Sequence, residues 1–384
     1  MSEARIDRIA NENNTGGPTL SGITTFSSQQ YFIPPSGSTA QRPSDCPPGS
    51  IRFNTDSAHL EYFDGLQWLE FEASSEELGN QNAAAGSSAS GTGYRGLIGG
   101  GAAPSPTFSK ADIDYITIST LGDSIKFGDL FTGRYNIASC SSSTRGLWAG
   151  GQTSPGSLTN LIDFVTFSST GNAADFADLN ASNRQNCAGA SSSTRGLFLG
   201  GQSPGTSPGI QNTIDYVTIA SQGVNAQDFG DLTQLVQAQR AVASSTRAVR
   251  FGGATPTKVN SIDYVTISSQ GNAQDFGDMS ATRWFHAACS NSTRGIVFGD
   301  NPAVNSIEFI TIPTTGNAQD FGDLTKTFDN CSAVSSPTRA VLTHGNNTEM
   351  EYVTLSSTGN GIVFGDLSTS HNIASGCSNG HGGL

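Results

Sequence analysis

Two charged side chains recur at fixed places along this 384-residue sequence and are the first candidates for chemistry. An arginine precedes an apolar run in six copies of a repeated segment: Arg95, Arg145, Arg195, Arg247, Arg294 and Arg339. An aspartate lies in a Phe-Gly-Asp-Leu phrase, or a variant of it, in each copy: Asp129, Asp178, Asp231, Asp278, Asp323 and Asp366. Because a guanidinium binds a carboxylate through two hydrogen bonds, the pattern predicts a structural Arg–Asp bridge in every copy. The alternative is a ring of carboxylates around a central channel that binds a cation.

The cysteines and histidines lack the spacing of a metal site. Cys140, Cys289 and Cys377 share one register of the repeated segment, and Cys187 and Cys331 lie three residues earlier in it. Since they belong to different copies, we expect them too far apart for disulfides and buried as small apolar side chains. No Cys-x-x-Cys pair occurs, and the five histidines are scattered. The sequence predicts no metal and no cofactor.

Catalytic motifs are also missing from the sequence. Glycoside hydrolysis needs two carboxyl groups that face one pocket, and acids outside the repeated positions are few, for example Asp112, Asp300, Asp329 and Glu349. Glycine runs such as 99–101 are not followed by the Lys-Ser/Thr of a phosphate-binding loop. We therefore predict that the protein is not an enzyme, and a capsule-degrading glycosidase is the least favoured function.

The elements that position these residues follow from a second repeated phrase. Ile-Asp-Tyr/Phe-Ile/Val-Thr-Ile/Phe occurs at 113–118, 162–167, 214–219 and 262–267, and looser copies begin at Ile307 and Met350. A period of 40 to 50 residues indicates an array of one supersecondary unit. Branched and aromatic residues with a period of two indicate strands, and Gly-Asn pairs indicate turns between them. We predict an all-β fold with four short strands in each of six units.

The unit resembles a blade of the kelch family of β-propellers. Arg134, the pair Gly150-Gly151, Tyr115, and Phe127 with Leu130 occupy places that correspond to the kelch pattern, although kelch units carry Trp where this sequence has Phe127. The resemblance covers residues 85–384 and implies a six-bladed kelch-like β-propeller. Residues 371–379 match the first strand of the other units, so we expect the last strand to complete the first blade. Residues 83–90 are the competing candidate for that strand.

The connections between strands differ in how much they vary. The turn between the third and fourth strands is nearly constant, whereas the connections between the second and third strands at 102–112, 202–213 and 254–261 differ freely. Recognition usually lies in loops that a rigid scaffold holds. Five residues in or near the variable connections are candidate receptor contacts: Phe108, Lys110, Lys258, Trp284 and Phe285. The alternatives are that these loops are only tolerated insertions and that Trp284 belongs to the core.

Composition restricts the partners. The formal net charge of −13 leaves no basic surface for nucleic acid or for an anionic membrane. No apolar run is long enough to span a bilayer, and the N-terminus has no signal-peptide pattern. We expect no nucleic acid partner, no membrane insertion, and synthesis in a cytoplasm.

The first 84 residues have a different character. Residues 1–32 are polar and predict an extended attachment arm, 33–72 predict a small β module, and 73–84 predict a polar linker. The module contains Thr39-Ala40-Gln41-Arg42-Pro43, then 49–56 (Gly-Ser-Ile-Arg-Phe-Asn-Thr-Asp), then 61–65 (Glu-Tyr-Phe-Asp-Gly) with Trp68. These motifs resemble a module of tailed-bacteriophage fibre and appendage proteins, and the repeats resemble those of cyanophage structural proteins.

The resemblance implies a structural component of a phage virion. We expect a tail fibre or appendage, assembled in the host cytoplasm, that attaches to other virion proteins through residues 1–72, with Ile51, Phe53, Tyr62, Phe63 and Trp68 as attachment residues. Its propeller would recognise a host-surface polysaccharide, and the resemblance also implies a homo-oligomer, with a trimer as the fibre precedent. The alternative is a purely structural decoration or connector protein of head, neck or tail with no receptor role.

Overall fold

The computed structural model describes residues 34–57, 59–70, 94–103, 108–153, 156–180, 183–205 and 209–384. The chain divides into two compact units, Met1–Ser75 and Glu76–Leu384. The expected arm at 1–32 and linker at 73–84 lie outside the described residues, as do 83–90, the competing candidate for the closing strand.

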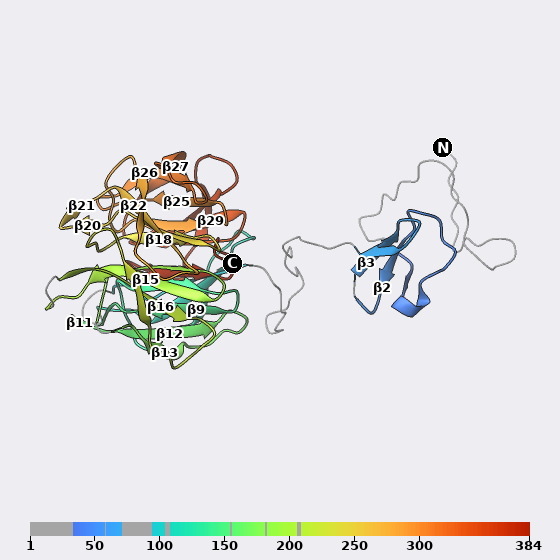
Figure 1. Ribbon diagram of the computed structural model, residues 1–384, viewed down its shortest axis with the longest axis horizontal. Coiled ribbons are helices and arrows are strands. Elements are labelled where there is room, and N and C mark those ends of the chain that lie inside the picture. The colour runs from blue at the N-terminus through green and yellow to red at the C-terminus, as the bar shows by residue number, and fades with distance from the viewer. Residues whose placement is uncertain are drawn as a thin grey trace. The chain divides into compact units, whose positions relative to one another are not determined.

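The described part of the second unit is all-β and contains six four-stranded antiparallel sheets, numbered here in chain order (Figure 1). Sheet 1 contains β32 (Ser375–Ser378), β5 (Arg95–Gly99), β6 (Asp112–Thr117) and β7 (Ile125–Asp129). Sheet 2 contains β8 (Ala138–Ser141), β9 (Arg145–Ala149), β12 (Leu161–Thr166) and β13 (Ala174–Asp178). Sheet 3 contains β14 (Ala188–Ser191), β15 (Arg195–Gln202), β16 (Ile210–Thr218) and β17 (Gln227–Asp231).

The remaining sheets have the same strand order. Sheet 4 contains β18 (Arg240–Ala243), β19 (Arg247–Phe251), β22 (Ser261–Thr266) and β23 (Gln274–Asp278). Sheet 5 contains β24 (Ala287–Ser290), β25 (Arg294–Phe298), β26 (Val304–Thr311) and β27 (Gln319–Phe328). Sheet 6 contains β28 (Ser332–Ser335), β29 (Arg339–Thr343), β30 (Glu349–Thr354) and β31 (Ile362–Asp366). Two small hairpins complete the set: β10 (Gln152–Thr153) with β11 (Ser157–Leu158), and β20 (Ala254–Thr255) with β21 (Thr257–Lys258).

The strands β8, β14, β18, β24, β28 and β32 form a closed cycle of neighbours, and we call them the axial strands. Each contacts the next in chain order, and β32 returns to contact β8. The predicted pairing at the seam is confirmed, because β32 pairs with β5 and places Ser375 opposite Gly99. Sequence-distant ends of the unit therefore share sheet 1.

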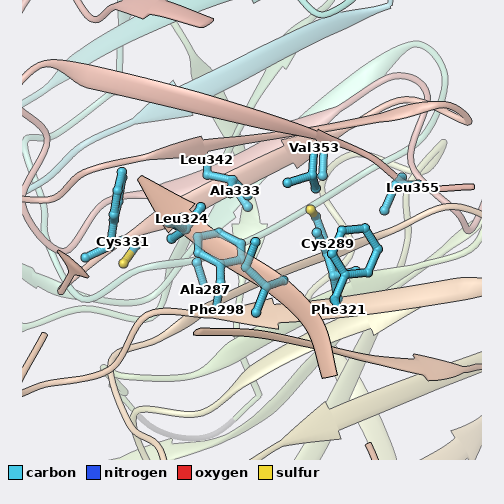
Figure 2. Close-up of a cluster of buried hydrophobic side chains, with 14 residues drawn as sticks. Ala287, Cys289, Phe298, Phe321, Leu324, Cys331, Ala333, Leu342, Val353 and Leu355 are labelled. Atoms are coloured by element: carbon cyan, nitrogen blue, oxygen red, sulfur yellow. The ribbon is translucent and has the colours of Figure 1, made fainter. Parts of the chain in front are cut away.

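The hydrophobic core lies between adjacent sheets. One cluster joins Cys289, Phe298 and Phe321 of sheet 5 to Leu342 and Val353 of sheet 6, and all five are buried (Figure 2). Five of the six cysteines are buried, and burial raises the pKa of the Cys140 thiol to about 12. Small axial side chains suit this packing because a methyl on Gly189 of β14 would lie 2.0 Å from the Ser139 carbonyl oxygen of β8.

The two ends of the unit differ. In Figure 1 the labels β11, β20 and β21 lie at one end of the unit, and the C-terminus lies at the other. The first end carries the connections that enter the axial strands, and we call it the variable face. The residue two positions before each axial strand there has a left-handed backbone: Asn136, Asn186, Ala238, Phe285, Asn330 and Ile373, with φ between 48° and 57°.

The first unit contains a small sheet in the order β1 (Ser36–Gly37), β2 (Ile51–Asn54), β3 (His59–Phe63) and β4 (Trp68–Glu70), with a 3-10 turn at Thr39–Gln41. One face buries charge, since the fully buried Glu61 lies 2.6 Å from Arg42 and 3.5 Å from Arg52. Hydrogen bonding to Arg42 lowers the pKa of Glu61. The module is therefore held by a polar network rather than by an apolar core.

Candidate binding surface

The repeated arginines dock neighbouring sheets, but through a different acceptor than the sequence predicted. Each guanidinium covers the aromatic ring of its own sheet's Ile-Asp-Tyr phrase at 4.5 to 5.3 Å, as Arg195 covers Tyr216 at 4.7 Å. It then donates to a backbone carbonyl at the end of that phrase in the next sheet, as Arg195 does to Ile267 at 2.7 Å. The same bond joins sheet 6 to sheet 1, from Arg339 to Ser119 at 2.8 Å.

The predicted Arg–Asp bridge is wrong. It was expected to join the arginines Arg95, Arg145, Arg195, Arg247, Arg294 and Arg339 to the aspartates Asp129, Asp178, Asp231, Asp278, Asp323 and Asp366. Among these twelve described residues no ion pair forms, because the arginines point to carbonyls while the aspartates lie on the outer strands. The aspartates use their backbone N–H groups to bond the next turn, as Asp231 does to Asn272 Oδ1 at 3.0 Å. Their outer-strand position also excludes the alternative, a carboxylate ring around the axis.

Buried ion pairs do recur, and they use the acid of the Ile-Asp-Tyr phrase. Arg134 and Asp163 are fully buried and lie 2.7 Å apart. The related ion pairs are Arg184–Asp215, Arg250–Asp263 and Arg283–Glu308, and in sheet 1 His371 lies 3.6 Å from Asp114. In the copy that forms sheet 4, Val236 occupies the position that corresponds to Arg134. There the acid of the phrase, Asp263, pairs instead with Arg250 of β19. In sheet 6, Phe328 replaces the cation, and Glu351 accepts bonds from Thr325 instead.

Three of the five candidate receptor contacts lie together on the variable face, and with Asp300 we call them the Trp284 cluster. Lys258 of β21 approaches Asp300 to 2.8 Å and lies 5.9 Å from the Trp284 ring centroid. The Trp284 and Phe285 ring centroids are 5.2 Å apart. The Trp284 backbone N–H donates to Asp300 Oδ1 at 3.0 Å, and its indole N–H donates to the Asn301 carbonyl at 2.6 Å.

The Trp284 cluster combines features that suit recognition of a polar ligand. Lys258, Trp284 and Phe285 are only partly buried, so aromatic rings and an ammonium group meet at the surface, while the Asp300 carboxylate that bonds to them is buried. Hydrogen bonds from Trp284 to Asp300 and Asn301 fix the orientation of the indole ring before a ligand binds. The alternative that Trp284 is a core residue is corrected by its partial exposure.

The other two candidates lie apart, on sheet 1. Phe108 is 43% exposed and has a left-handed backbone, with φ of 53°. The Lys110 ammonium donates to the Ser370 carbonyl. The structure shows no contact that joins them to the Trp284 cluster among the described side chains.

The attachment residues of the N-terminal module occupy both faces of its sheet. Ile51 lies opposite Tyr62 in the pairing of β2 with β3, and Phe53 lies opposite Leu60, so these form one apolar face. Ile51 is 50% exposed. Phe63 and Trp68 pack together on the other face at 5.5 Å, and Arg52 lies 5.8 Å from the Trp68 ring.

One functional candidate escaped the sequence reasoning. Arg240 begins the axial strand β18, where the corresponding residues are Ala138, Ala188, Ala287, Ser332 and Ser375. A small cavity of about 40 Å³ is lined at this level by residues of all six sheets, and Arg240 is the charged residue among them. Comparing the copies position by position would have singled it out.

Comparison with other proteins adds no assignment. No protein-family model matches the sequence, and no curated protein is similar to it. Within the residues that the structure describes, no group of three or more His, Cys, Asp or Glu side chains could hold a metal ion. The same residues contain no helix of the length and hydrophobicity needed to cross a membrane.

Proposed function

We propose that the six sheets are the blades of a kelch-like β-propeller. Three observations support this: the closed cycle of axial strands, the seam between β32 and β5, and the arginine bonds that run from each sheet to the next and from sheet 6 to sheet 1. A ring leaves no terminal sheet uncovered, which is the physical reason for such a cycle.

We further propose that the protein is a virion appendage, such as a phage tail fibre, that recognises a host-surface polysaccharide. The observation that carries this proposal is the Trp284 cluster, which breaks the sixfold pattern on the variable face. Aromatic faces with nearby hydrogen-bonding charges are suited to sugar rings, which present C–H groups on one side and hydroxyls at the edge. Weak contacts of this kind gain strength when an oligomer presents several copies, and a trimer is the expected form.

Attachment is assigned to the N-terminal region. The face of Ile51, Phe53 and Tyr62 supports this, because an apolar face on a four-stranded module is suited to packing against another protein. The sequence motifs of residues 39–43 and 49–56 support a virion protein as that partner.

A glycan array of bacterial surface polysaccharides, probed with the full-length protein, tests the recognition role. We expect binding that Trp284→Ala reduces at least about fivefold, since loss of an aromatic platform costs about 1–3 kcal/mol in binding. Phe131→Ala is the matched control, because Phe131 is an exposed aromatic, at 63%, outside the cluster. Equal binding by Trp284→Ala and the parent protein would overturn the assignment of this surface.

A second candidate function, a structural connector, is favoured by one specific feature. The outer strands of sheets 2 to 5 begin Ala-Asp or Gln-Asp, whereas β31 of sheet 6 begins with Ile362 and Val363, which are 55% and 65% exposed. Leu121 and Ile125 of the adjoining sheet 1 are also exposed, each at 58%. An apolar patch on two neighbouring edge strands is suited to packing against another virion protein.

The double variant Ile362→Gln/Val363→Asp tests the connector role, since it restores the residues of the other sheets. If the patch packs against a virion protein, the variant should assemble into particles at reduced occupancy while its glycan binding is unchanged. Normal occupancy of the variant would remove the support for a connector.

A further inference from the structure

Arg240 is a cation without a counter-ion at the axis of the second unit. Its Nη1 donates to the carbonyl of its own neighbour Gln239 at 2.9 Å, and no described acidic side chain forms an ion pair with it. Arg240 is partly buried, whereas the four buried arginines described above, Arg134, Arg184, Arg250 and Arg283, each have an Asp or Glu partner. Burial lowers the pKa of Arg240 to about 10, which reflects the cost of removing a guanidinium from water.

The surroundings of Arg240 are neutral and carry hydrogen-bonding groups. The cavity is lined by small side chains, among them Ala188, Ala241 and Ala287, and by Ser139 and Ser375, whose hydroxyls are 2.7 Å apart. The nearby His286 is fully buried, and burial together with Arg240 holds its pKa well below the ordinary value. His286 is therefore uncharged at neutral pH, and Arg240 supplies the positive charge of this pair.

The far end of the axis is closed by the chain itself. His381 Nε2 lies 2.9 Å from the Ser141 carbonyl, and the Gly382 N–H donates to the Ser290 carbonyl at 2.9 Å. A methyl on Gly383 would lie 1.8 Å from the Ser191 carbonyl, so the tail fits this closely only with glycine. These contacts span axial strands of sheets 2, 3 and 5 and make the axial space a cup that opens toward the variable face.

We propose that this cup is a binding site for a small carboxylate, either a free monocarboxylate or the acidic end of a larger molecule, held by the Arg240 guanidinium. The planar guanidinium offers donors in the fork geometry that a carboxylate accepts, and the neutral walls leave its charge uncompensated until an anion enters. The small volume excludes a whole oligosaccharide from the cup. Binding here does not depend on the Trp284 cluster or on a virion role.

The test observes Arg240 directly in the full-length protein. With selective ¹⁵N-arginine labelling, the Nε–H resonance of Arg240 is assigned by its loss in Arg240→Gln. Titration with acetate should shift this resonance saturably, and glucose at the same concentration should not. Lys126→Ala, which removes an outer-strand cation of 48% exposure, should leave the shift unchanged.

Ala288→Leu provides a second variant, since it fills the cup and leaves Arg240 in place. Acetate affinity, measured for every variant by isothermal titration calorimetry, should fall at least tenfold in this variant and in Arg240→Gln. Saturable binding of both acetate and glucuronate indicates the acidic end of a larger molecule as the ligand, and binding of acetate alone indicates a free small acid. The proposal is overturned if acetate causes no saturable shift, if Arg240→Gln binds acetate as well as the parent, or if chloride produces the same shift at the same concentration.

Discussion

The repeated arginines are structural residues, and opposite charge alone did not predict their hydrogen-bond acceptors. Each has an aspartate available in its own copy, yet each bonds a carbonyl of the next sheet and covers an aromatic ring, as Arg247 does with Ile312 and Tyr264. Such bonds avoid the desolvation of a second charge, while the ring supplies a face for the guanidinium. The acid that does pair with a cation is the buried one of the Ile-Asp-Tyr phrase.

Asp114 gives this arrangement a pH dependence that can be measured. Burial acts to raise its pKa, but the adjacent His371 and the hydrogen bonds from Ser368 and Ser124 outweigh burial and lower the pKa to about 2. Because the pKa is lower in the folded state, the resulting stability is complete above the unfolded value near 4 and is lost as pH falls toward 2. We expect Asp114→Asn to flatten the loss of unfolding free energy between pH 4 and pH 2 by about 2 kcal/mol, measured by urea unfolding.

Asp129→Asn is the control for this measurement, because the Asp129 side chain is 43% exposed and lies on an outer strand. Its pH profile should match that of the parent protein within about 0.5 kcal/mol. A parent-like slope in Asp114→Asn would show that the His371–Asp114 pair does not control the acid stability.

At the scale of elements, six left-handed residues connect one sheet to the next at the variable face. The Asn186 N–H donates to the Asn136 carbonyl at 2.9 Å, and the Ala238 N–H donates to the Asn186 carbonyl at 3.0 Å. Asparagine tolerates this backbone conformation, and it occupies three of the six positions. Ile373 has the same conformation although a β-branched residue is strained there, so the tertiary contacts impose it.

Exchanging these residues should change stability in opposite directions. Ile373→Asn should raise the free energy of unfolding by about 1 kcal/mol through relief of backbone strain. Asn136→Ile introduces the same strain at the equivalent position and should lower it by a similar amount. Chemical denaturation of both variants measures this, and destabilisation by Ile373→Asn would mean that packing of the isoleucine side chain outweighs the strain.

At the scale of the whole molecule, stability depends on the seam between the two ends of the second unit. Without residues 371–384, β5 would lose its axial partner and Asp114 would lose His371. We expect this deletion to lower the melting temperature by more than about 10 °C, or to prevent folding, because 1 kcal/mol corresponds to about 2–4 °C at this size. Deletion of 380–384 alone removes the residues that close the far end of the axis but keeps β32, and it should lower the melting temperature by only about a few degrees.

Calorimetry of the two truncations distinguishes these outcomes. Equal melting temperatures for the 371–384 and 380–384 deletions would show that the seam contributes little and would also weaken the proposal of a closed ring.

The sequence by itself determined the strands, their number in each unit and the pairing of the C-terminal strand with the first. These follow from local patterns, since apolar alternation and Gly-Asn turns repeat in every copy and residues 371–379 match a strand type already present. Comparison of copies also pointed to Lys258, Trp284 and Phe285 as residues outside the repeat.

Only the tertiary structure decided which groups meet. The packing of adjacent sheets decides whether a carboxylate or a carbonyl oxygen lies within reach of each repeated arginine. The spacing of residues within one copy does not encode this packing. In sheet 4, Arg250 takes the place of the missing cation because its strand, β19, lies beside β22, which carries the buried Asp263. The isolation of Arg240 depends on six axial strands that converge from the whole length of the second unit, so its unpaired charge becomes visible only when they are brought together.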